Sequence, residues 1–201
     1  MELLPWLAAL GGVAWFLWSR EADVVNLTDR LDKATPPRIG QWARELAAAA
    51  EATRPAALDL WTWATTLAGL IDRESNGGES LKPRGPRGTG DNGHGLGLAQ
   101  LDDRAHPGLK EQPELWGDPA WNIRRGASEL AHLYARAEAI EALDPERRLA
   151  YALAGYNAGG VVFHGAGDPN DDPDVHTTGG DYSSDVLARA GGFAASSEAT
   201  A

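Results

Sequence analysis

One glutamate of the chain is placed where a buried proton donor could act. Apolar residues recur upstream of Glu74 at helical spacing, and Glu74 is the next position on that stripe, which comprises Leu60, Trp63, Ala64, Leu67, Leu70 and Ile71. Because burial disfavours the charged carboxylate, we expect the pKa of Glu74 to rise towards neutrality. A carboxylic acid that is protonated near neutral pH can serve as a general acid. The alternative is that the helix frays here and that water surrounds Glu74.

Two aspartates, Asp91 and Asp102, flank a segment in which glycines alternate with larger residues from Gly93 to Leu98. A period of two predicts a strand or hairpin with one face stripped of side chains. If the segment folds as a hairpin, its two ends come together and place both aspartates at the mouth of one site. Glycoside hydrolysis uses one carboxylic acid with a raised pKa and one ionised carboxylate. The alternative is that Glu74, Asp91 and Asp102 are three unrelated acids on the surface. The glycine spacing matches neither a dinucleotide fingerprint nor a P-loop.

Composition and residue spacing exclude several classes of function and of site. The chain has 201 residues, 43% of them hydrophobic, which is enough to fill one ordinary core. A net charge of −11 argues against nucleic-acid binding, and the lack of cysteine excludes disulfides and thiolate metal sites. The five histidines show no zinc-ligand spacing. The alternating acids from Asp168 to Asp174 fail as a calcium loop because Pro173 replaces the turn glycine. We therefore expect neither a metal nor a cofactor.

The N-terminal segment is apolar. Residues 3–18 contain Trp6, Trp15 and Trp18 near the ends of the run, a pattern similar to the aromatic belts of a membrane span. The run is a little shorter than the ~20 residues that cross a bilayer upright, and no basic residue precedes it as in a signal peptide. We predict an uncleaved membrane anchor over residues 1–20, with a signal peptide or a buried helix as alternatives.

The rest of the chain predicts one mainly α (α+β) domain, a helical bundle with a small β-hairpin beside the candidate site. The charged residues 21–38, which contain Pro-Pro, predict a tether with one helical turn. Residues 79–92 predict a flexible flap over a cleft or a surface excursion. The domain is expected over residues 39–192, with a disordered tail over 193–201. The expected helices are 39–53, 57–73, 121–140, 146–157 and 183–190.

Five motifs, in order and at close to the family's spacing, resemble the goose-type lysozymes and the related soluble lytic transglycosylases of glycoside hydrolase family 23. The resemblance covers about residues 60–190 and rests on Ile71–Ser75, Asp91–Asp102, Arg104–His106, Ala154–Gly159 and Asp181–Ala190. Each motif alone is short and has low specificity, but the ordered set is strong. It implies a lysozyme-like fold.

The resemblance also implies a reaction, which is cleavage of the β-1,4 bond between N-acetylmuramic acid and N-acetylglucosamine in peptidoglycan glycan strands. Glu74 matches the family's general acid, and Asp91 and Asp102 match the aspartates proposed to position water for inversion. The substrate-binding residues that it implies are Tyr156, Asn157, Tyr182, Gln100 and His106. For Gln100 and His106, structural hydrogen bonding is an equal alternative.

Two departures from the family pattern are Ala99, where methionine is usual, and Gly155, where alanine is usual. The acidic charge and the absence of disulfides are typical of a bacterial or phage member. We expect a monomer, membrane-anchored at the cell envelope or associated with a virion.

Two other functions stay open at this point. A lytic transglycosylase lets the muramic 6-hydroxyl attack and leaves a 1,6-anhydro end, and it needs no water-holding aspartate. Retention of Asp91 and Asp102 favours hydrolysis over that reaction. A non-catalytic glycan-binding module of a virion or secretion apparatus is the alternative from another class, and the presence of all three acids argues against it.

Overall fold

The computed structural model describes residues 22–168 and 170–199. The expected membrane anchor over residues 3–18 lies outside the described residues. Within the described part of the chain, no helix is both long and apolar enough to cross a membrane. The anchor therefore stays a prediction, and so does the boundary between it and the rest of the chain.

The segment expected as a tether is largely helical. Residues 22–34 form a helix, followed by the short helix α2 (Pro37–Gly40). Leu27, Leu31 and Ala34 are buried, and the two leucines belong to the main core. These residues recur at helical spacing, so one face of a charged segment packs against the fold while its charges face water. The expectation of a linker with one helical turn is wrong for this part of residues 21–38.

Two helices lead to the candidate acid. The single helix expected over residues 39–53 is divided into α2 and α3 (Ala43–Thr53), separated by Gln41 and Trp42. The next helix, α4 (Leu60–Ser75), begins three residues later than expected, because the Asp59 side chain accepts a hydrogen bond from the amide of Thr62 at 2.9 Å.

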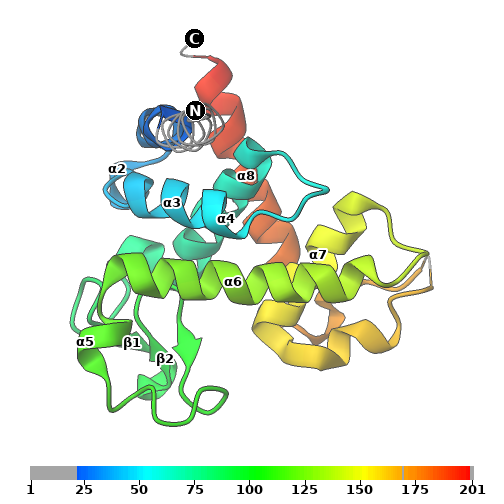
Figure 1. The fold of residues 1–201 in the computed structure, drawn as a ribbon. Helices are drawn as coiled ribbons and strands as arrows, with labels where there is room; N and C mark the ends of the chain where they lie inside the picture. The colour runs from blue at the N-terminus through cyan, green and yellow to red at the C-terminus, as the bar shows by residue number, and fades with distance from the viewer. Residues whose placement is uncertain (1–21, 169, 200–201) are drawn as a thin grey trace, which may run out of the picture.

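Three longer helices complete the helical part. In Figure 1, α6 (Pro119–Glu138) crosses the molecule above the strands, and α7 (Pro145–Ala158) follows it. Both agree with the expected helices to within two residues at each end. The last helix, α8 (Tyr182–Glu198), is longer than expected, and Phe193 packs against the main core. The expectation of a disordered tail over residues 193–201 is therefore wrong up to residue 198.

The β-element is a three-stranded antiparallel sheet in the order β1 (Thr89–Gly90), β2 (Gly95–Leu96) and β3 (Leu101–Asp102). Gly95 pairs with Gly90 on one side and with Asp102 on the other. The glycines are needed because the Gln100 side chain occupies the space that a Cβ at Gly90 or Gly95 would fill. The mainly α fold with a small β-hairpin is confirmed.

The core lies between these helices. Its main cluster includes Leu46 of α3, Trp63 and Leu67 of α4, and Leu130 of α6. A smaller cluster around Tyr151 joins α7 to the short helix η3 (Gly159–His164). The remaining short helices are α5 (Pro113–Trp116), η1 (Asn76–Gly78), η2 (Asp91–Gly93), η4 (Pro173–His176) and η5 (Thr178–Gly180).

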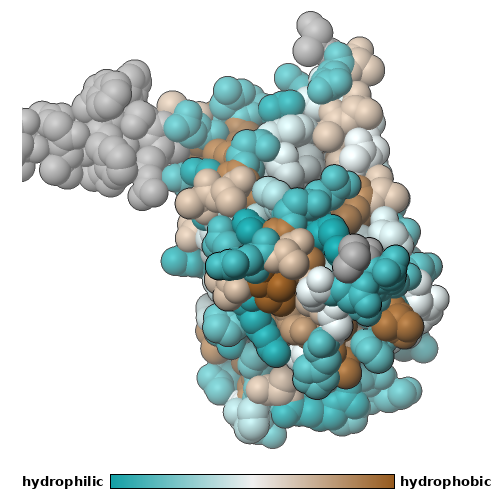
Figure 2. Space-filling model, turned by 90° about the vertical axis from the view of Figure 1, so that its right-hand side faces the viewer, coloured by the Kyte–Doolittle hydropathy of each residue, from teal (hydrophilic) through white to brown (hydrophobic). Residues whose placement is uncertain are grey.

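The surface is largely hydrophilic on the face shown in Figure 2, with small apolar patches between polar residues. Among the described residues, the exposed large hydrophobic side chains are Val25, Val161 and Val175. The basic loop of residues 79–92 consists mostly of turns.

Candidate active site

A cleft of about 410 Å³ lies between the helices and the sheet. The helical wall is formed by residues of α4, α7, η5 and α8, and the opposite wall by residues of the sheet and its turns. The side chains that the cleft brings together include Glu74, Asp91, Asp102, Tyr156, Asn157, Gln100 and Tyr182, which are seven of the eight sequence-predicted site residues. In the loop of residues 79–92, only Asp91 is among the lining residues, so the basic side chains of this loop do not line the cleft.

Glu74 is the penultimate residue of α4, and it is partly buried. Helix α4 continues through the fully buried Ser75 and ends at Asn76, which adopts the left-handed conformation with φ 50°. The alternative of a frayed helix end is therefore wrong. Burial raises the pKa of Glu74 to about 7, although a hydrogen bond from Tyr182 and the charge of Arg73 both act to lower it. Near neutral pH, a large fraction of Glu74 carries a proton.

Two tyrosines stand beside this carboxyl group. The hydroxyl of Tyr182, at the start of α8, donates a hydrogen bond to Oε1 of Glu74. The hydroxyl of Tyr156, near the end of α7, donates to the carbonyl oxygen of Ala99 at 2.8 Å. Burial raises the pKa of both tyrosines well above the ordinary value, and the nearby charge of Glu74 adds to the effect. Both hydroxyls therefore remain protonated and act as donors at neutral pH.

Asp91 and Asp102 meet at Arg104, a residue for which the motifs implied no role. Nη2 of Arg104 lies 2.7 Å from Oδ2 of Asp91 and 2.7 Å from Oδ2 of Asp102. The hydrogen bond from Arg104 is the main cause that lowers the pKa of Asp102. Asp91 reaches this position from a left-handed turn, in which it has φ 43° and Asn92 has φ 55°. The close sequence spacing of Asp102 and Arg104 was the available signal for this pair.

Gln100 and Asn157 line the cleft, and each also makes a hydrogen bond within its own wall. Nε2 of Gln100 donates to the carbonyl of Gly97 at 2.6 Å, while Oδ1 of Asn157 accepts from the amide of Thr178 at 2.8 Å. These bonds fix the shape of the cleft on both sides. For Gln100, the structural hydrogen bond that we considered is present together with its place in the cleft.

His106 is not among the residues that line the cleft. Its Nε2 lies 3.0 Å from Oε1 of Glu129 on α6, and its Nδ1 lies 3.5 Å from Nη2 of Arg125 on the same helix. The described contacts of His106 therefore tie the loop after the sheet to α6.

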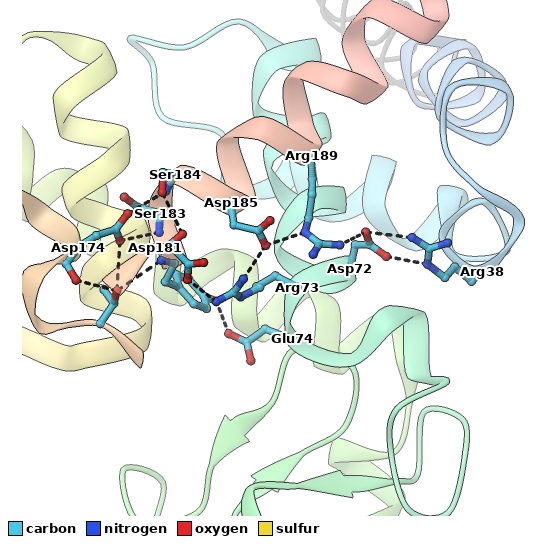
Figure 3. Close-up of polar contacts among 12 residues, drawn as sticks. Arg38, Asp72, Arg73, Glu74, Asp174, Asp181, Ser183, Ser184, Asp185 and Arg189 are labelled. Atoms are coloured by element: carbon cyan, nitrogen blue, oxygen red, sulfur yellow. Dashed lines mark hydrogen bonds and ion pairs between the residues drawn. The ribbon is translucent and has the colours of Figure 1, made fainter. Parts of the chain in front are cut away.

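Behind Glu74, charged side chains alternate from α2 to the start of α8, and we call this series the charge chain. It runs in the order Arg38, Asp72, Arg189, Asp185, Arg73 and Asp181, with contacts between 2.5 and 2.8 Å (Figure 3). Asp72 is 4% exposed and is held by arginines from two other elements. The charge chain joins α4, which carries Glu74, to α8, which carries Tyr182.

Asp174 fixes the start of α8. Its Oδ1 accepts from the amide of Ser183 at 2.7 Å and its Oδ2 from the amide of Ser184 at 3.0 Å (Figure 3). Backbone amides at a helix start are good partners for a carboxylate. This acid of the alternating series from Asp168 therefore serves the helix that carries Tyr182.

Comparison with known proteins identifies the family. The model of the family "Lysozyme g" matches residues 57–197. The chain belongs to this family. Lysozyme G of Dromaius novaehollandiae is 35% identical over 129 residues, which cover 62% of this chain and 55% of that protein.

Other members of the lysozyme g family have similar identity and coverage. Lysozyme g of Struthio camelus is also 35% identical over 129 residues, and lysozyme g of Gallus gallus is 34% identical over 126 residues. The match covers 62% of this chain in each case, and 55% and 53% of those two proteins. The chain thus spans about half the length of the curated relatives that it matches. The resemblance to goose-type lysozymes is confirmed, whereas a bacterial or phage origin stays a prediction.

Proposed function

We propose that this protein is a peptidoglycan hydrolase that cleaves the β-1,4 bond between N-acetylmuramic acid and N-acetylglucosamine. The observation that carries the proposal is a glutamate with a pKa of about 7 in a cleft that also holds a pair of ionisable aspartates. One protonated and one ionised carboxyl group are what the hydrolysis of a glycosidic bond requires. Membership of the lysozyme g family supports the choice of substrate.

In the proposed reaction, Glu74 transfers its proton to the glycosidic oxygen as the bond from that oxygen to C1 breaks. A water molecule held by Asp91 and Asp102 attacks C1 from the opposite face of the sugar, and its proton passes to their carboxylates. This single displacement inverts the configuration at C1. Tyr182 keeps the Glu74 carboxyl group oriented towards the substrate, and Tyr156, Asn157 and Gln100 form the surface that receives the sugar.

Mass spectrometry of digested cell walls tests both the reaction and its rival. We expect reducing-end muropeptides from the wild-type chain. Predominantly 1,6-anhydro muropeptides would replace the hydrolase by a lytic transglycosylase, and an absence of any cleavage would leave a non-catalytic glycan-binding module. Glu74→Gln should reduce the rate by orders of magnitude because the amide has no proton to donate. Glu141→Gln, at an exposed residue outside the cleft, is the matched control.

We also propose that residues 3–18 hold the protein in a membrane at the cell envelope, or in a virion if it comes from a phage, and that it acts as a monomer. The apolar run and its tryptophans support the anchor. Fractionation of cells tests the anchor, because an embedded chain should need detergent for release. Release by salt alone would refute it. Sedimentation of the detergent-released chain should give the mass of one copy.

A further inference from the structure

Arg104 contacts both aspartates of the cleft with one end of its guanidinium group. Nη2 lies 2.7 Å from Oδ2 of each carboxylate, and Nε lies 2.9 Å from Oδ1 of Asp102. The backbone amide of Arg104 also donates to Oδ1 of Asp102 at 2.8 Å. Asp102 is thus held by both the backbone amide and the guanidinium group of Arg104. Nη2 of the same guanidinium group also holds Asp91.

This arrangement limits how far apart the two carboxylates can lie. Both Oδ2 atoms are 2.7 Å from the same nitrogen, so their separation is at most twice that distance. A water molecule that makes two ordinary hydrogen bonds spans oxygens that are up to about 5.5 Å apart. One water molecule can therefore bind both carboxylates on the cleft side of Arg104. Without the guanidinium group, two like charges at this separation repel each other.

We propose that Arg104 is a positioning residue that holds Asp91 and Asp102 together as one water-binding pair, and that it thereby sets the ratio of hydrolysed to 1,6-anhydro products. The inference rests on the proposed function and assigns a role to a residue to which neither the motifs nor that function gave one. The three side chains are 58%, 57% and 40% exposed for Arg104, Asp91 and Asp102, so their ion pairs add little to stability. Their effect is on the geometry of the attacking water.

The two possible reactions differ in the nucleophile. Both break the bond between C1 and the glycosidic oxygen, and in both Glu74 supplies the proton to the leaving oxygen. In hydrolysis, water forms the new bond to C1 and its proton goes to the aspartate pair. In the competing reaction, the muramic 6-hydroxyl forms the bond to C1 and its proton returns to the Glu74 carboxylate. Loss of Arg104 should therefore slow the first reaction and leave the second unchanged.

The test uses the full chain with Arg104→Gln, Arg104→Lys and the control Arg44→Gln, at an exposed arginine of α3 outside the cleft. The rates of formation of reducing-end and 1,6-anhydro muropeptides are measured separately in each digest. We expect Arg104→Gln to lower the hydrolytic rate at least about tenfold and to raise the anhydro share of the products. The hydrolytic rate and the anhydro share of Arg104→Lys should lie between those of Arg104→Gln and wild type, because a single ammonium group cannot make all the contacts of the guanidinium group. Thermal unfolding midpoints should be similar for all four chains.

An unchanged product ratio in Arg104→Gln, whether the total rate falls or not, would overturn the role of Arg104 and leave a merely structural ion pair. A wild-type chain without activity on cell walls would instead overturn the proposed function. The two failures are therefore distinguished by the wild-type digest alone.

Discussion

Tyr182 donates a hydrogen bond to Oε1 of Glu74 although the two residues are 108 positions apart in the chain. They meet because α8 packs against α4 and because the charge chain joins the two helices beside Glu74 (Figure 3). The bond favours the ionised carboxylate, while burial favours the protonated one, and burial has the larger effect. The pKa of Glu74 is thus set near neutral pH by two opposing contributions, burial and the hydrogen bond from Tyr182.

The pH dependence of activity should follow Glu74. Because Glu74 must be protonated to donate, we expect kcat/KM to be high below about pH 7 and to fall about tenfold per pH unit above it. Because Arg104 lowers the pKa of Asp102, protonation of that aspartate should reduce the rate only at a pH below the ordinary aspartate pKa. Initial rates on cell-wall suspensions across the pH range check this profile. An alkaline limb centred below pH 5 would contradict a raised pKa.

Ionisation of Glu74 should also cost stability. Its pKa is raised from 4.5 to about 7 in the folded protein, so its stabilising contribution is present below pH 4.5 and is lost as the pH rises through 7. Glu74→Gln removes this dependence. Between those pH values, the free energy of unfolding of the wild type should fall by at most about 3 kcal/mol relative to the variant. Urea unfolding at both ends of the range measures the difference, and parallel curves would rule the effect out.

Removal of the Tyr182 hydroxyl should move the alkaline limb in a defined direction. The hydrogen bond lowers the pKa of Glu74, so Tyr182→Phe should raise that pKa and shift the limb to higher pH. Tyr151→Phe is the control, because that hydroxyl contacts Asp171 at 2.6 Å in the smaller cluster rather than Glu74. It should leave the limb in place. A shift of the Tyr182→Phe limb to lower pH would show that the bond favours the protonated acid instead.

Two aspartates of the charge chain should differ sharply in their effect on stability. The Asp72 side chain is 2% exposed and pairs with two arginines, so Asp72→Asn removes the carboxylate that Arg38 contacts and one of the two that Arg189 contacts, and it should cost about 2–4 kcal/mol. The Asp181 side chain is 57% exposed, and Asp181→Asn should cost at most about 1 kcal/mol. Urea unfolding of both variants tests the contrast. Equal costs would mean that burial does not decide the strength of these pairs.

Two glycines near the sheet provide a matched test of packing. Gly93 and Gly97 both have positive φ, of 92° and 69°, so alanine at either position strains the backbone by about 1 kcal/mol. Only at Gly97 would the new methyl group also collide with the buried Asn122 side chain, whereas at Gly93 the nearest atom is 3.9 Å away. Gly97→Ala should therefore lower the unfolding free energy by about 1–3 kcal/mol more than Gly93→Ala. Similar values would show that the wall of the cleft adapts.

Local patterns in the sequence determined much of the fold. The apolar spacing of α4, α6 and α7 places each helix within a few residues of its observed position. The spacing also places Glu74 on the buried side of its helix, and the glycine alternation predicts the hairpin that brings Asp91 and Asp102 together. These features depend on interactions between near neighbours, which a periodic pattern records directly.

Contacts between distant segments were decided only by the tertiary structure. The helix over residues 22–34 is charged enough to predict a tether, and its packing depends on a core built by later residues. The partner of Glu74 on α8 and the order of the charge chain depend on which of many similar side chains the fold brings within reach. The partner of a charged side chain cannot be predicted from the neighbouring sequence, because electrostatic attraction depends on distance in space and on burial rather than on spacing along the chain.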